Sequence, residues 1–182
     1  MRRRDPKMFQ SSLDKFAINL AHDQPRFVPV PNNLLADMRG RAYWIPLFSV
    51  KSKGKARIVF DARAANSEKT CLNEALLQGP DRNNNLRGVL QRFRCHPIAC
   101  TADINNMFHN CATTDNDNTY LRFYWFRDND PDKDLIQWMS KVHVMGLTSS
   151  PAVANLIVRY ASRETPPANG EIWIKEDDLL DP

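Results

Sequence analysis

Asp103 is the residue of this chain whose type and position most directly suggest chemistry. It follows a short apolar run, residues 98–102, and the aromatic Phe108 stands five positions after it. If the run is a strand, the carboxylate lies at its carboxyl end, where α/β-type sheets place ligand-binding groups. A carboxylate there suits Mg²⁺, which prefers oxygen ligands. Asp is also a favoured N-cap, and a helix beginning at Ile104 would give Asp103 a structural role instead.

A row of cations is the second feature with chemical potential. Lys51, Lys53, Lys55 and Arg57 are spaced by two, so on a strand they would share one face. Cations gathered on one face without acids form a phosphate-binding surface. The alternative for the lysines is an edge strand that uses them to block aggregation. Arg57 lies inside an apolar run, which favours the functional interpretation.

Hydrophobic periodicity and turn residues predict the elements that position these groups. The Ser-Lys-Gly tip at residues 52–54 predicts a hairpin, and Pro151 after two serines predicts a helix start. Prolines keep residues 24–31 extended, and residues 113–118 are predicted as a loop. The predicted helices are residues 7–22, 33–38, 84–95 and 152–162, and the predicted strands are 42–50, 98–102, 119–126, 135–145 and a last one from 171 that runs into Asp177 and Asp178.

The composition is that of an ordinary globular chain. Its 182 residues are 42% hydrophobic and 25% charged, enough for one buried core. No apolar run reaches the roughly 18 residues of a membrane span, so we expect no membrane partner. The amino-terminal stretch is basic and lacks an apolar core, so we expect no secretory signal and an intracellular, cytoplasmic or nuclear, reducing location.

The cysteines and the charge distribution narrow the function classes. Cys71, Cys95, Cys100 and Cys111, together with nearby histidines, fit no zinc spacing, and several are expected in a buried strand. Residues 1–100 carry 18 Lys and Arg against 8 Asp and Glu, whereas residues 101–182 carry 7 against 13. A basic half joined to an acidic half suits a protein that holds a polyanion on one side and metal ions on the other.

The order of these blocks resembles the fingers and palm of a reverse transcriptase, and more narrowly the BEL/Pao class of LTR retrotransposons. The resemblance extends from about residue 43 to residue 180. It is carried, in order, by Arg57-Ile58-Val59-Phe60-Asp61, Leu72-Asn73-Glu74 through Gly79-Pro80, Thr101-Ala102-Asp103-Ile104 through Met107-Phe108, Leu121-Arg122-Phe123, the Gly-x-x-Ser-Ser-Pro helix start and the Asp-Asp pair.

This resemblance implies a fold and a reaction. The fold would be α+β, a right-hand polymerase of the DNA/RNA polymerase superfamily with palm and fingers. Residues 1–42 would form a helical and extended lead-in, and residues 43–182 a partial reverse transcriptase domain. The reaction would be RNA-directed DNA synthesis, with template–primer nucleic acid and deoxynucleotide triphosphates as partners.

The resemblance also assigns roles to residues. Asp103, Asp177 and Asp178 match the catalytic carboxylates that hold two Mg²⁺ (or Mn²⁺) ions. The other positions match nucleotide-binding residues: Lys53, Lys55 and Arg57 on the triphosphate, Phe108 against the sugar, and Met145 with Gly146 under the incoming nucleotide.

The last block departs from the family pattern. Lys175 and Glu176 stand before the paired acids where the family has an aromatic and a variable residue, and the chain ends before a returning strand. We therefore expect a palm incomplete at its C-terminus, with an open sheet edge and poor solubility. The alternative function is a catalytically inactive remnant that binds nucleic acid through its basic face. A metal-dependent phosphohydrolase using the same acids is a third interpretation, without a His-Asp signature to support it.

Overall fold

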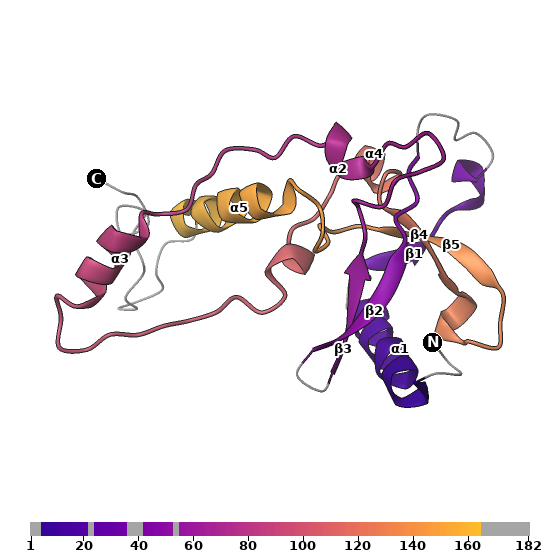
Figure 1. Cartoon of the computed structure of the whole chain (residues 1–182), viewed down its shortest axis with the longest axis horizontal. Helices are drawn as coiled ribbons and strands as arrows, with labels where there is room; N and C mark the ends of the chain where they lie inside the picture. Colours follow the sequence, from indigo (N-terminus) through magenta and orange to yellow (C-terminus); the bar gives the residue numbers. More distant parts are fainter. Residues whose placement is uncertain (1–4, 22–23, 36–41, 53–54, 165–182) are drawn as a thin grey trace.

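The computed structural model describes residues 5–21, 24–35, 42–52 and 55–164, and it confirms the α+β class. The strands and α1 lie together on the right of Figure 1, whereas α3 and α5 extend to the left. Within the described residues, every helix falls short of the length and hydrophobicity that a bilayer-spanning segment needs. The elements in chain order are α1 (Pro6–Leu20), β1 (Phe27–Pro29), η1 (Asn32–Leu34), β2 (Leu47–Ser52), β3 (Lys55–Phe60), α2 (Leu72–Ala75), α3 (Leu86–Phe93), η2 (Met107–Asn110), α4 (Asp115–Asn118), β4 (Arg122–Phe126), η3 (Arg127–Asn129), β5 (Leu135–Ser140) and α5 (Ser150–Glu164), where η denotes a 3₁₀ helix.

A three-stranded antiparallel sheet with the order β1-β5-β4 forms the centre of the fold. Residues 43–45 extend this sheet along the outer edge of β4. The Ile45 amide donates to the Arg122 carbonyl at 2.7 Å, and the Arg122 amide donates to the Tyr43 carbonyl at 3.2 Å. The strand predicted for residues 42–50 is therefore divided at Pro46, because its first half joins β4 and its second half begins β2.

The predicted hairpin is confirmed, since β2 and β3 pair antiparallel with Ser52 opposite Lys55. The prediction that Lys51 and Arg57 share a face is wrong. Residues directly opposite each other in a hairpin share a face, and Arg57 lies opposite Val50 whereas Lys51 lies opposite Ala56. The register of the two strands thus places these cations on opposite faces, although both are exposed.

Phe16 of α1 joins the helix to the sheet through aromatic rings. It is fully buried, stacks on Trp125 with ring centroids 4.6 Å apart, and meets Trp138 edge-on at 5.4 Å. Phe27 and Phe123 complete the contacts of this ring. The helix itself begins as its sequence predicts, with the Asp5 carboxylate accepting from the Met8 amide at 2.9 Å. α1 is therefore part of the same core as β1, β4 and β5.

α3 forms where it is predicted but does not join this core. The Asn85 side chain caps it by accepting from the Arg87 amide at 2.9 Å. Its apolar residues remain open to solvent among the described residues: Leu86 is 70% and Leu90 46% exposed. α5 is anchored better, because Ala154 is buried and the Arg159 guanidinium donates to the Arg82 carbonyl at 2.7 Å.

The strand predicted for residues 98–102 is absent from the described structure. These residues are extended and exposed, and Ile98 has 80% of its surface in solvent. A strand needs a hydrogen-bonded partner, and no described strand pairs with this run. The expectation of buried-strand cysteines is wrong for the same reason, since Cys95 and Cys100 are exposed and only Cys111 is buried. The predicted strand from residue 171 lies outside the described residues.

Smaller differences concern where elements begin and end. The predicted loop 113–118 contains the short helix α4, because Thr114 accepts from the Asp117 amide and caps it. The strand predicted for residues 135–145 ends at Ser140. The Ser140 hydroxyl donates to the Val142 carbonyl at 2.7 Å, at the point where the chain leaves the sheet.

Candidate functional site

Asp103 lies on the exposed segment between α3 and η2. It ends no strand, because residues 98–102 form none. It caps no helix either, since η2 begins at Met107 with Asn106 as its N-cap. Both structural interpretations of Asp103 from the sequence are therefore wrong, and its carboxylate is open to solvent. Phe108 lies in η2 and is half-buried.

The segment of Met145 and Gly146 is held by the side chain of Asn73, which connects two blocks far apart in the sequence. The Asn73 amide nitrogen donates to the Gly146 carbonyl at 2.9 Å, and its oxygen accepts from the Thr148 amide at 2.9 Å. Gly146 has φ of +117°, and a Cβ there would lie 2.2 Å from the Phe60 carbonyl oxygen. Only glycine lets this turn lie directly against the end of β3.

The predicted cationic and acidic residues are partly described. Arg57 is exposed on β3, and Lys55 begins that strand. Lys53, Asp177 and Asp178 lie outside the described residues. Among the residues that are described, no three His, Cys, Asp or Glu side chains gather closely enough to hold a metal ion. The oxygen-only set of Asp103, Asp177 and Asp178 suits Mg²⁺ in its chemistry, and Asp103 is its one described member.

Comparison with models of known protein families and with curated proteins gives no match to this chain. The likeness to reverse transcriptases therefore rests on the residues quoted for it.

A cavity of about 610 Å³ is the feature that the sequence did not indicate. Three segments form it: α2, residues 112–121 and residues 143–153. Its apolar wall consists of Leu72, Ala75, Leu76, Ala112, Leu121, Leu147 and Val153, and its polar lining of Thr113, Thr114, Asp117, Tyr120, His143 and Ser149. Cavities of this size and composition are typical of small-molecule sites. No local pattern could reveal it, because its walls meet only in the folded chain.

His143 is a half-buried titratable group of the cavity lining, whereas Asp117 is exposed. Its Nδ1 lies 3.2 Å from the hydroxyl of the fully buried Ser150, and that hydroxyl donates to the Val144 carbonyl at 2.9 Å. Because a hydroxyl has a single hydrogen, Nδ1 is the donor and Nε2 is left as an acceptor. Burial lowers the pKa of His143 more than the negative charge of Asp117 raises it, so the ring is neutral near pH 7.

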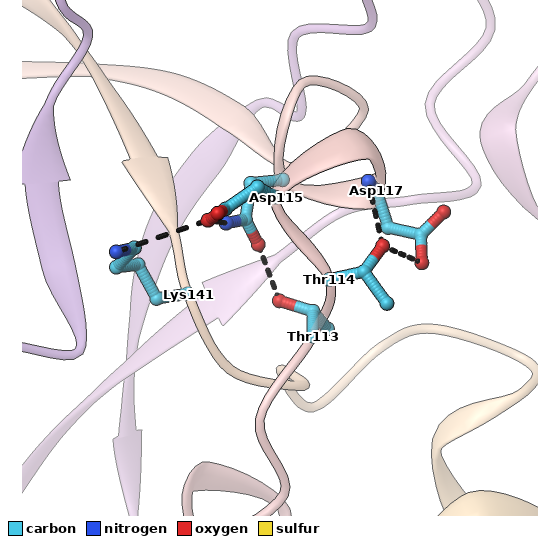
Figure 2. Close-up of polar contacts among 6 residues, drawn as sticks. Thr113, Thr114, Asp115, Asp117 and Lys141 are labelled. Atoms are coloured by element: carbon cyan, nitrogen blue, oxygen red, sulfur yellow. Dashed lines mark hydrogen bonds and ion pairs between the residues drawn. The ribbon is translucent and has the colours of Figure 1, made fainter.

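The side chains of residues 113–117 lie on two sides of the turn that carries them, and Asp115 does not line the cavity. Figure 2 shows the Thr114 and Asp117 side chains on one side of this turn and the Asp115–Lys141 pair on the other. The Thr114 hydroxyl donates to the Asp117 carboxylate at 2.7 Å, whereas the Lys141 ammonium lies 3.9 Å from Asp115. The cation of Lys141 is thus directed away from the carboxylate that lines the cavity.

Among the described histidines, His109 in η2 has the largest displacement of its pKa. Its ring packs edge-on against Phe27 with centroids 5.9 Å apart. Burial, and secondarily the positive charge of Arg26, lowers its pKa from 6.5 to about 4. The Arg26 guanidinium is itself held close by, donating to Asn110 at 3.0 Å. His109 is therefore neutral in the folded protein over most of the acidic range.

Gly146→Ala should lower the free energy of unfolding by about 2–4 kcal/mol, because the new Cβ meets backbone that cannot move aside freely. Chemical denaturation measures the change. Gly88→Ala is the matched control: it lies in the first turn of α3, where alanine is the better helix former, so it should cause no loss. Equal stabilities of Gly146→Ala and the wild type would contradict the close approach to Phe60.

Acidification from about pH 7.5 to pH 5 should destabilise the protein through His109. The unfolded chain binds a proton near pH 6.5 and the folded chain only near pH 4, so stability falls as the pH drops through this window. The full difference, reached only below about pH 4, corresponds to about 3 kcal/mol at about 1.36 kcal/mol per pKa unit, and about 2 kcal/mol of it is lost by pH 5. Denaturation curves across this range should show a shallower pH dependence for His109→Phe, which keeps the contact with Phe27. His143 contributes in the same direction, so some slope should remain. An unchanged slope in His109→Phe would contradict the assignment.

Proposed function

We propose that this chain is derived from a reverse transcriptase of the BEL/Pao type and binds nucleic acid through its basic half, without preference for sequence. The observation that carries the proposal is the exposure of cations on two elements of that half. Lys51 and Arg57 project from the two faces of the hairpin, and Arg87, Arg92 and Arg94 are exposed on or beside α3. The right-hand polymerase fold and an intracellular location are part of the same proposal.

The charge distribution supports a polyanionic partner. Two ion pairs of the described chain, Lys133–Asp128 and Lys141–Asp115, lie in the acidic half. The cations of the hairpin and α3 are exposed in a half with an excess of ten positive charges, 18 Lys and Arg against 8 Asp and Glu. When such side chains neutralise phosphate groups, the counterions condensed on the nucleic acid are released into solution, and this release favours binding. Because these contacts are made to the sugar–phosphate backbone of the nucleic acid, they carry no information about its base sequence.

Removing cations from the basic half should weaken binding of a short labelled single-stranded oligonucleotide, RNA or DNA, measured by fluorescence anisotropy. The wild type should lose affinity steeply between about 50 and 200 mM salt, and each lost phosphate contact should reduce the slope of log K against log salt by about 0.7. Three double variants each remove two positive charges: Lys51→Gln with Arg57→Gln, Arg87→Gln with Arg92→Gln, and, as the control in the acidic half, Arg127→Gln with Lys133→Gln.

The control pair should bind nearly as the wild type does, since its charges lie outside the proposed surface. Binding that ignores salt, or an equal loss in all three variants, would overturn the proposal.

A second candidate is RNA-directed DNA synthesis with Mg²⁺ or Mn²⁺ held by Asp103, Asp177 and Asp178. The specific observation in its favour is the exposed carboxylate of Asp103, in a segment whose spacing to Phe108 matches the family block. When bound, the metal ions would supply charge stabilisation for phosphoryl transfer. Of the three carboxylates, the structure describes one, so this activity remains a proposal.

Asp103→Asn should abolish the heat of Mg²⁺ or Mn²⁺ binding in a calorimetric titration, because the neutral amide is a poor ligand for a hard cation. Asp115→Asn, also an exposed acid but on α4, should leave that heat unchanged. Primer extension on poly(rA)–oligo(dT) should likewise be lost in Asp103→Asn and retained in Asp115→Asn. The absence of metal binding and of extension in the wild type would remove this candidate and leave the nucleic-acid-binding proposal intact.

A further inference from the structure

The cavity between α2, residues 112–121 and residues 143–153 has the properties of a ligand site separate from both proposals above. None of the cations proposed to contact nucleic acid lines it, and neither does Asp103. Its volume of about 610 Å³ would accommodate a compact molecule of one or two rings. The chemistry of its lining determines which class of molecule can bind there.

The apolar wall of the cavity selects a hydrophobic body. Leu72 of α2 and Leu76, which directly follows that helix, face it from one segment, and Leu147 with Val153 from another. Leu72 and Leu147 are themselves anchored in the core, each about nine-tenths or more buried. The wall is also held in register, because Asn73 of α2 hydrogen-bonds Gly146 and Thr148 across it. A preformed apolar wall favours rigid hydrophobic ligands, because little order is lost on binding.

The polar lining selects a donor group with positive charge. Asp117 contributes a carboxylate, and His143 contributes a neutral ring whose Nε2 is an acceptor. None of the described lining residues is Lys or Arg, and the nearby Lys141 pairs with Asp115 on the other side of the turn. The lining thus carries net negative charge and acceptors. A primary ammonium group, with three donors and no acceptor, is its complement.

We propose that this cavity binds a small apolar amine in its protonated form, with the ammonium at Asp117 and His143 and the hydrophobic body against Leu72, Leu76 and Leu147. An arylalkylamine is the simplest molecule of this class. Carboxylates of the same shape are excluded, because Asp117 repels them and the described lining offers them no cation.

Three probes of nearly equal shape separate the contributions of charge and hydrophobic body: 2-phenylethylamine, 2-phenylethanol and 3-phenylpropionate. Saturation-transfer NMR titrations on the full chain should show the highest affinity for the amine, a lower affinity for the alcohol and the lowest for the carboxylate. The amine should bind at least about tenfold more tightly than the carboxylate. Because Asp117 is exposed, salt should narrow the gap between amine and carboxylate without reversing the order.

Two variants make the same chemical change on the two sides of the turn. Asp117→Asn should reduce amine binding by about fivefold or more and leave the alcohol unchanged, because only the charge is removed. Asp115→Asn should change neither, because Asp115 pairs with Lys141 outside the cavity. Circular dichroism confirms that both variants fold. Equal binding of the three probes, no binding of the amine to the wild type, or equal behaviour of the two variants would overturn the proposal.

Discussion

The burial of Phe16 among the rings of three strands is the contact on which the described fold depends. One side chain of α1 touches Phe27 of β1, Phe123 and Trp125 of β4, and Trp138 of β5, with ring centroids 4.6–6.0 Å apart. Aromatic pairs at such distances add attraction beyond the area that they bury. A small sheet with one helix has few other ways to exclude water from its face. The hairpin joins through Phe60, which packs on Phe27 and Phe123.

This core does not reach the segment that carries Asp103. α3 and residues 94–106 are largely exposed, and their large apolar side chains keep between 38% and 80% of their surface in solvent. Two-metal chemistry requires carboxylates held within about 0.5 Å by packing and hydrogen bonds around them. Asp103 has no such support in the described chain, whereas the cavity wall at Leu72 and Leu147 has it. Binding through exposed cations needs no such precision, which is why nucleic-acid binding is the leading proposal.

Local patterns predicted the elements that depend on local physics. The periodicity of α1 and α5 and the turn residues of the hairpin gave correct helices and a correct pairing. Residues 98–102 were misassigned because an apolar run becomes a strand only where a partner strand meets it. The faces of Lys51 and Arg57 were misassigned because spacing along one strand does not continue from β2 into β3, where the pairing register decides the face. The cavity escaped prediction, since its three segments are up to about eighty positions apart.

Several residues that carry the resemblance to reverse transcriptases have structural roles in this chain. Asn73 holds the turn at Gly146, and Gly146 allows that turn to lie against Phe60. Arg122 is fully buried in β4, with a guanidinium nitrogen 3.2 Å from the Leu34 carbonyl. These structural roles account for the residues without any shared activity, and the case for catalysis rests on carboxylates alone.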